Sequence, residues 1–68
     1  MYNIGDLITW VSSAGKLDGR IVNIVHGLNA AGKMIPWIIV EHKTRRTFQR
    51  VMMAGTESHA KMMKIEVL

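Results

Sequence analysis

The 68-residue chain contains no cysteine and only one proline. Without cysteine the chain has no disulfide bonds, and the usual structural zinc sites are excluded as well. None of its apolar runs approaches the roughly 20 residues that cross a bilayer, and its first residues lack the basic start and long apolar core of a signal peptide. These absences predict a cytoplasmic protein with no membrane segment.

Motifs of catalysis and metal binding are also missing. The three histidines, His26, His42 and His59, lie sixteen and seventeen residues apart, which is not the spacing of a metal site. Residues 30–34 lack the first glycine and the Ser/Thr of a phosphate-binding loop. Glu41 and His42 are neighbours on a predicted strand and therefore face opposite sides. We expect no enzyme activity, no metal and no cofactor.

What is present is an apolar fraction of 49%, which is high for so short a chain and predicts an ordered core. The length allows one domain, residues 1–68, close to the lower size limit for independent folding. Nine Lys and Arg against five Asp and Glu give a net charge of +4. This balance suits a polyanionic partner such as nucleic acid, and it is also common in small proteins that need only solubility.

Short runs rich in β-branched and aromatic residues, separated by clusters of Gly, Ser and Asn, predict five strands. The predicted ranges are 7–11, 19–26, 37–42, 47–53 and 64–68. Pro36 opens the third strand, where its missing N–H is tolerated. Thr56 can cap a short helix before the fifth strand, and Glu57 complements its dipole. An all-β fold with five strands, a long second connection and a helical turn before the last strand is the layout of an SH3-like barrel.

The opening of the chain carries a short motif, Gly-Asp-Leu-Ile-Thr-Trp at 5–10 followed by Gly-Arg-Ile at 19–21. It resembles the Gly-Asp-x-hydrophobic-x-aromatic and Gly-x-hydrophobic pattern of KOW modules, Tudor-like domains and related small Tudor-like proteins. The resemblance covers about the first third of the chain. It implies an SH3-like barrel with Ile8 and Trp10 pointing into its interior.

Positive charge is concentrated between the third and fourth predicted strands, in eight positions that contain no acid. The basic residues there are Lys43, Arg45, Arg46 and Arg50. Arginine forks suit phosphate oxygens, and Phe48 can stack on an unpaired base, with Lys33 and Trp37 flanking. The alternative is a solvated turn whose charges protect an edge strand from aggregation.

The third predicted strand is apolar on both faces, so its register stays open. One register points Ile38 and Val40 inward and turns Trp37, Ile39 and Glu41 outward. The opposite register buries Trp37 in the core. An outward Trp37 is an interface anchor or a stacking platform, and two apolar faces favour a subunit contact.

The methionines occur in pairs, at 52–53 and 62–63, and one member of each pair is expected to fill the core. Together these features predict a small, non-enzymatic module that binds RNA or DNA with low sequence specificity through a basic hairpin tip. The alternative is a protein-interaction or homo-oligomeric assembly module, such as a phage or plasmid accessory protein. Its apolar docking residues are Trp37, Ile39, Met52 and Met53.

Overall fold

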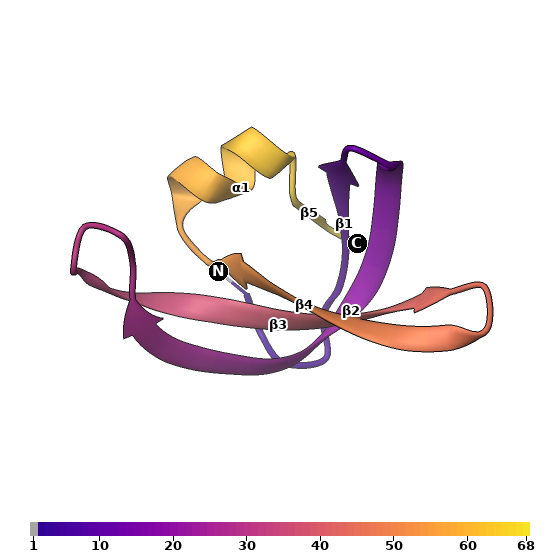
Figure 1. Ribbon diagram of the computed structural model, residues 1–68, viewed down its shortest axis with the longest axis horizontal. Coiled ribbons are helices and arrows are strands. Elements are labelled where there is room, and N and C mark those ends of the chain that lie inside the picture. Colours follow the sequence, from indigo (N-terminus) through magenta and orange to yellow (C-terminus); the bar gives the residue numbers. More distant parts are fainter. Residues whose placement is uncertain (1) are drawn as a thin grey trace.

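Five antiparallel strands form one sheet, and a short helix packs against it, in the computed structural model, which describes residues 2–68 (Figure 1). The elements are β1 (Leu7–Ser12), β2 (Gly15–Leu28), β3 (Met34–Thr44), β4 (Thr47–Ala54), α1 (Glu57–Met63) and β5 (Glu66–Val67). The sheet order is β4-β3-β2-β1-β5. The prediction of an all-β chain with a short helix before the last strand is confirmed.

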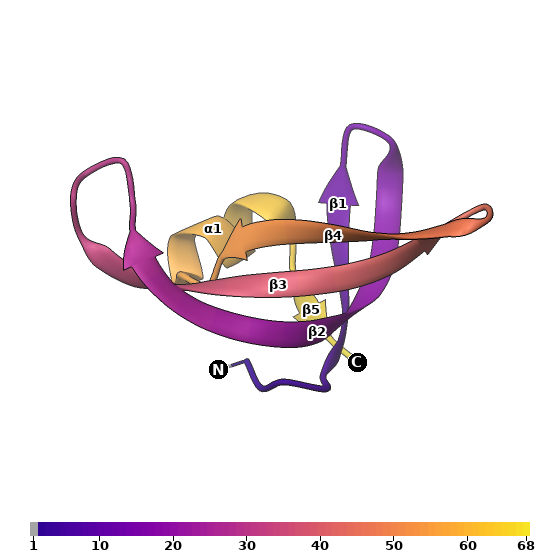
Figure 2. The same ribbon diagram turned by 60° about the horizontal axis from the view of Figure 1, so that its bottom comes forward.

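The sheet is strongly curled but does not close into the barrel expected from the sequence (Figure 2). β2 pairs with β1 through residues 15–20 and with β3 through residues 20–28, and its register shifts between Ile21 and Asn23. β4 and β5 end the strand order, and among residues 2–68 they do not pair with each other. β5 has only two residues, both of which pair with β1.

β5 is shorter than the predicted 64–68 because Lys64 terminates the helix instead. Lys64 adopts a left-handed conformation with φ of 53°, and its N–H donates to helix carbonyls. At the other end of α1, the Thr56 hydroxyl accepts a hydrogen bond from the His59 N–H at 3.3 Å. The predicted threonine cap is confirmed. No helix formed by residues 2–68 is long and apolar enough to cross a membrane.

Pro36 lies within β3 rather than before it. Asn29 N–H donates to the Lys33 carbonyl, and Gly55 N–H donates to the Pro36 carbonyl. Hydrogen-bonded and non-bonded pairs alternate along an antiparallel ladder. The nitrogen and the carbonyl of one residue point to the same side of the strand, and the Pro36 carbonyl bonds to Gly55. The nitrogen of Pro36 therefore also faces β4, just beyond the last β3–β4 pair at Trp37 and Ala54. The proline removes no bond from the β2–β3 ladder, and it coincides with the end of β4.

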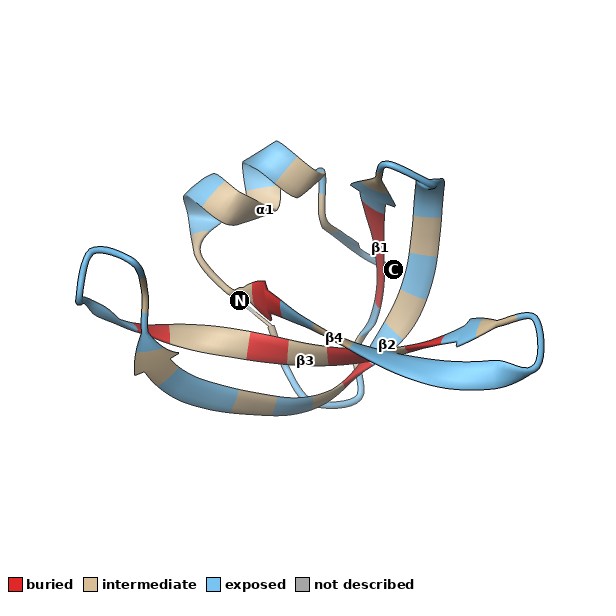
Figure 3. Ribbon diagram, viewed as in Figure 1, coloured by how far each residue is buried: buried red, intermediate tan, exposed pale blue. Residues whose placement is uncertain are grey.

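The buried residues of the core lie on β1, β2, β3 and β4 (Figure 3). They are Ile8, Trp10, Ile21, Ile38, Val40 and Met53. The inward direction of Ile8 and Trp10 is confirmed. In β3, Ile38 and Val40 are buried while Trp37 and Ile39 lie half-buried on the opposite face. The open question of register is thereby decided in favour of an outward Trp37.

The methionine pairs divide as predicted between core and surface. Met53 is buried, whereas Met52 is 58% exposed. Met63 packs against the core, and Met62 is exposed. Met53 was predicted as an interface residue as well, but its burial places it in the core because it faces inward opposite Ile38.

Candidate nucleic-acid interface

The β3–β4 hairpin projects from one end of the molecule and carries Arg45 and Arg46 at its tip (Figure 1). Thr44 pairs directly with Thr47, so the two arginines form a two-residue turn. Arg45 has a φ of 44°, in the left-handed region, and the Thr44 hydroxyl lies 3.3 Å from the Thr47 hydroxyl. The turn therefore holds two guanidinium groups beyond the end of the sheet.

Lys43, Arg45 and Arg46 are all exposed and make no ion pair among residues 2–68. We call these three residues the basic turn. Arg50 differs from them, since its Nε lies 3.3 Å from Glu41 Oε2 and the two charges compensate each other. Of the four basic residues predicted to contact phosphate, Arg50 therefore differs from the other three in having an acidic partner.

Glu41 was missed because it lies outside the basic segment of the sequence. A two-residue turn at 45–46 makes Thr44 pair with Thr47. From there the pairing moves back one residue in β3 for every residue forward in β4. Glu41 then faces Arg50. Fixing the turn length in the sequence is enough to find this ion pair.

The predicted flanking residues do not all join the basic turn. Phe48 does, since it faces Lys43 across the hairpin and is 67% exposed. Lys33 precedes β3, whereas Lys43 lies near its end. At a rise of about 3.3 Å per residue, the ten residue steps between the two lysines span up to about 33 Å. Trp37 lies up to about 20 Å from Lys43 by the same measure.

The outer face of the sheet brings together an apolar patch. Ile39 pairs with Met52, and Trp37 pairs with Ala54. Side chains of directly paired residues lie on the same face, so these four form a contiguous group. Three of the four predicted docking residues, Trp37, Ile39 and Met52, therefore share this surface.

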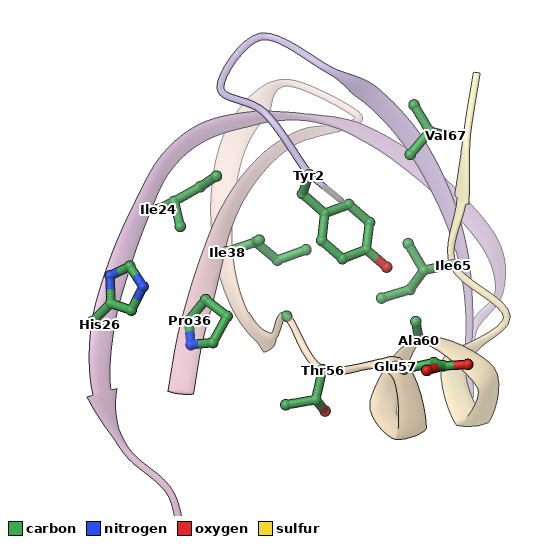
Figure 4. Close-up of a pocket in the computed structure, with 11 residues that line it drawn as sticks. Tyr2, Ile24, His26, Pro36, Ile38, Thr56, Glu57, Ala60, Ile65 and Val67 are labelled. Atoms are coloured by element: carbon green, nitrogen blue, oxygen red, sulfur yellow. The ribbon is translucent and has the colours of Figure 1, made fainter. Parts of the chain in front are cut away.

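A pocket of about 800 Å³ opens on the inner side of the curl (Figure 4). Its walls are mainly aliphatic, and Tyr2, His26 and Glu57 add polar groups. Partial burial raises the pKa of the Tyr2 phenol above its usual 10.0. The pocket depends on how far the sheet curls and where the two termini meet it, and no local sequence signal indicates either.

A second, smaller hollow of about 310 Å³ lies at the end of β4, and we call it the β4 hollow. It is lined by Asn29, Ile35, Trp37, Ala54, Thr56, Ser58, His59 and Met62. The β4 hollow joins the apolar patch at Trp37 and Ala54. Within residues 2–68 no group of three or more potential metal ligands of the His, Asp and Glu type comes together.

Comparison of the chain with protein-family models, with curated proteins and with solved structures finds no match in any of the three.

Proposed function

We propose that this protein binds nucleic acid through the basic turn, with little preference for sequence. The observation that carries the proposal is the exposure of Lys43, Arg45 and Arg46 at one projecting end without an ion-pair partner in the described chain. Guanidinium forks and an ammonium group donate charge-assisted hydrogen bonds to phosphate oxygens. No other acid lies between Glu41 and Glu57 to compete for them.

Binding of this kind is electrostatic. Each phosphate that a cation neutralises releases condensed counterions, which supplies most of the affinity at low salt. A two-residue turn presents no helix or ribbon to read base edges in a groove, so the contacts position the chain without selecting a sequence. RNA and DNA offer the same phosphate chemistry, and both are ligands in this proposal.

We also assign the fold to the SH3-like class. Five strands in this connectivity, with a short helix between β4 and β5, support the assignment, as does the motif shared with KOW and Tudor-like domains. In this assignment the short β5 leaves the barrel open.

A second candidate is an assembly module that docks through the outer apolar patch. Met52 is 58% exposed beside the half-buried Trp37 and Ile39, which favours a covering partner. The patch and the basic turn occupy different parts of the outer surface, so the two functions do not exclude each other.

The test compares two double variants that remove the same charge. Arg45→Ala with Arg46→Ala removes two of the three cations of the basic turn, while Lys16→Ala with Lys33→Ala removes two exposed lysines elsewhere. Fluorescence anisotropy of labelled single- and double-stranded oligonucleotides measures the affinity. We expect the arginine variant to weaken binding about tenfold or more on every sequence, because each charge-assisted hydrogen bond contributes on the order of 1.5 kcal/mol. An equal loss in both variants would show that net charge alone attracts the nucleic acid.

A further inference from the structure

Among residues 2–68, no strand pairs with the outer edge of β4. Thr47 pairs with Thr44 across the turn, and Gly55 N–H donates to the Pro36 carbonyl, so the odd-numbered residues of β4 bond to β3. The even-numbered residues therefore direct both N–H and C=O away from the sheet. They are Phe48, Arg50, Met52 and Ala54.

This edge lacks most of the features that usually keep edge strands apart. β4 has eight residues, contains no proline, and pairs with β3 without a bulge. Its only charged residue, Arg50, is compensated by Glu41. The other edge strand, β5, is two residues long and offers little to pair with. β4 is thus the edge of the sheet that offers the longer run of backbone groups to a further strand.

We propose that a second copy of this chain pairs along β4, antiparallel, about a twofold axis at Val51. This register places Arg50 opposite Met52 of the partner subunit and Phe48 opposite Ala54 of the partner subunit. In this register, all four residues whose backbone N–H and C=O point away from the sheet bond to the partner's strand. A twofold axis at Arg50 would place the positively charged Arg50 side chains of the two copies opposite each other. A twofold axis at Met52 would leave Phe48 beyond the end of the partner's strand.

The proposed register also matches an exposed aromatic to a cavity. Phe48 is 67% exposed, and Ala54 lies on the same face, next to Trp37. Phe48 of each copy therefore arrives beside the β4 hollow of the other, which Trp37, Ala54 and Met62 line. A volume of about 310 Å³ is ample for a phenyl ring. The contact is self-complementary, as a twofold interface requires.

The proposed register places the two basic turns at opposite ends of the joined β4 strands. Formation of the dimer does not depend on nucleic-acid binding, and either proposal can fail while the other holds. The dimer proposal rests on the assembly candidate of the proposed function, for which it names the partner and the register.

A pair of single cysteines tests the register in a chain that has no cysteine of its own. In the proposed dimer, Val51 faces the partner's Val51 in a non-bonded pair, with Cα atoms about 4.5 Å apart, which is within disulfide range. Gln49 faces Met53 of the partner subunit instead. Mild oxidation should convert Val51→Cys into a covalent dimer much faster than Gln49→Cys. Because Gln49 is the more exposed of the two, random collision predicts the reverse order, and that result would overturn the register.

A charge pair tests the same contact without cross-linking. Met52→Lys places a cation opposite the partner's Arg50, while Met52→Glu places an anion there, and both remove the same exposed side chain. Sedimentation velocity over a micromolar to millimolar series should show a concentration-dependent dimer for the wild type. We expect Met52→Lys to raise the dimer dissociation constant at least tenfold above that of Met52→Glu. A wild type that stays monomeric throughout, or two variants that dissociate equally, would contradict the proposal.

Discussion

Trp10 and His42 meet edge to face in the centre of the curl, with ring centroids 5.6 Å apart and ring planes at 89°. Trp10 belongs to β1 and His42 to β3, two strands that lie on opposite sides of β2 in the sheet. Both side chains are buried, at 2% and 6% exposure. This contact joins the two halves of the curled sheet across the core, in a geometry that aromatic pairs prefer.

Replacing Trp10 with alanine should unfold or severely destabilise the protein. Loss of a buried aromatic of this size costs about 3–5 kcal/mol, comparable with the whole stability of a small domain. Leu28→Ala is the control, because Leu28 is 64% exposed and its loss should change stability by less than about 0.5 kcal/mol. Thermal melts followed by circular dichroism measure both. A cooperative Trp10→Ala melt within a few degrees of wild type would show that the contact holds little together.

Gly19 should tolerate no methyl group, because β2 and β3 approach closely there. A Cβ at Gly19 would lie 2.7 Å from the Glu41 carbonyl oxygen and 2.8 Å from Val40 Cγ1. Gly19→Ala should lower the free energy of unfolding by about 1–3 kcal/mol. Gly27→Ala, in the same strand, meets only the Trp37 ring at 3.3 Å, which can shift. Urea unfolding should therefore rank Gly27→Ala as the milder change, and equal stabilities would show that β2 adjusts at Gly19.

Thr9→Val should stabilise the protein. The Thr9 hydroxyl is buried and has no hydrogen-bond partner among the described residues. Exchanging an unsatisfied hydroxyl for a methyl group of the same shape should raise the free energy of unfolding by about 1 kcal/mol. Thr44→Val is the matched control, since the Thr44 hydroxyl contacts Thr47 and gains nothing from removal. A loss of stability in Thr9→Val would reveal a partner for the hydroxyl.

The stability of the protein should fall in alkali in a way that depends on Tyr2. Burial raises the pKa of the Tyr2 phenol in the folded state above 10.0. Below pH 10 the phenol is protonated in both states, and its contribution is constant. As the pH rises from 10 through the folded pKa, the unfolded chain loses this proton first, so the free energy of unfolding decreases.

Tyr2 is the only tyrosine, so the absorbance of tyrosinate reports its titration directly. Tyr2→Phe should flatten the alkaline decrease in stability measured by urea unfolding. An unchanged decrease in this variant would assign the effect to other groups.

The sequence was informative where structure depends on local pattern. The resemblance of the Gly-Asp motif to KOW and Tudor-like domains implied an inward Ile8 and Trp10, and the Thr56 hydroxyl identified the start of α1, because both signals lie within a few residues. Closure of the sheet was not predictable, since it depends on where strands distant in the sequence meet, and the length of β5 was overestimated because Lys64 caps the helix instead. The predicted third strand, 37–42, covered only the apolar run, whereas β3 extends from Met34 to Thr44. This longer strand separates Lys33 from Lys43.

The most direct test of nucleic-acid binding by the basic turn is the salt dependence of the affinity. The logarithm of the association constant should fall linearly with the logarithm of salt concentration, by about 0.7 per phosphate contact on single strands and 0.9 on duplexes. In Arg45→Ala with Arg46→Ala, the slope should flatten by about two such contacts. A slope identical to that of the wild type, or a wild-type affinity that does not change with salt, would contradict the proposal.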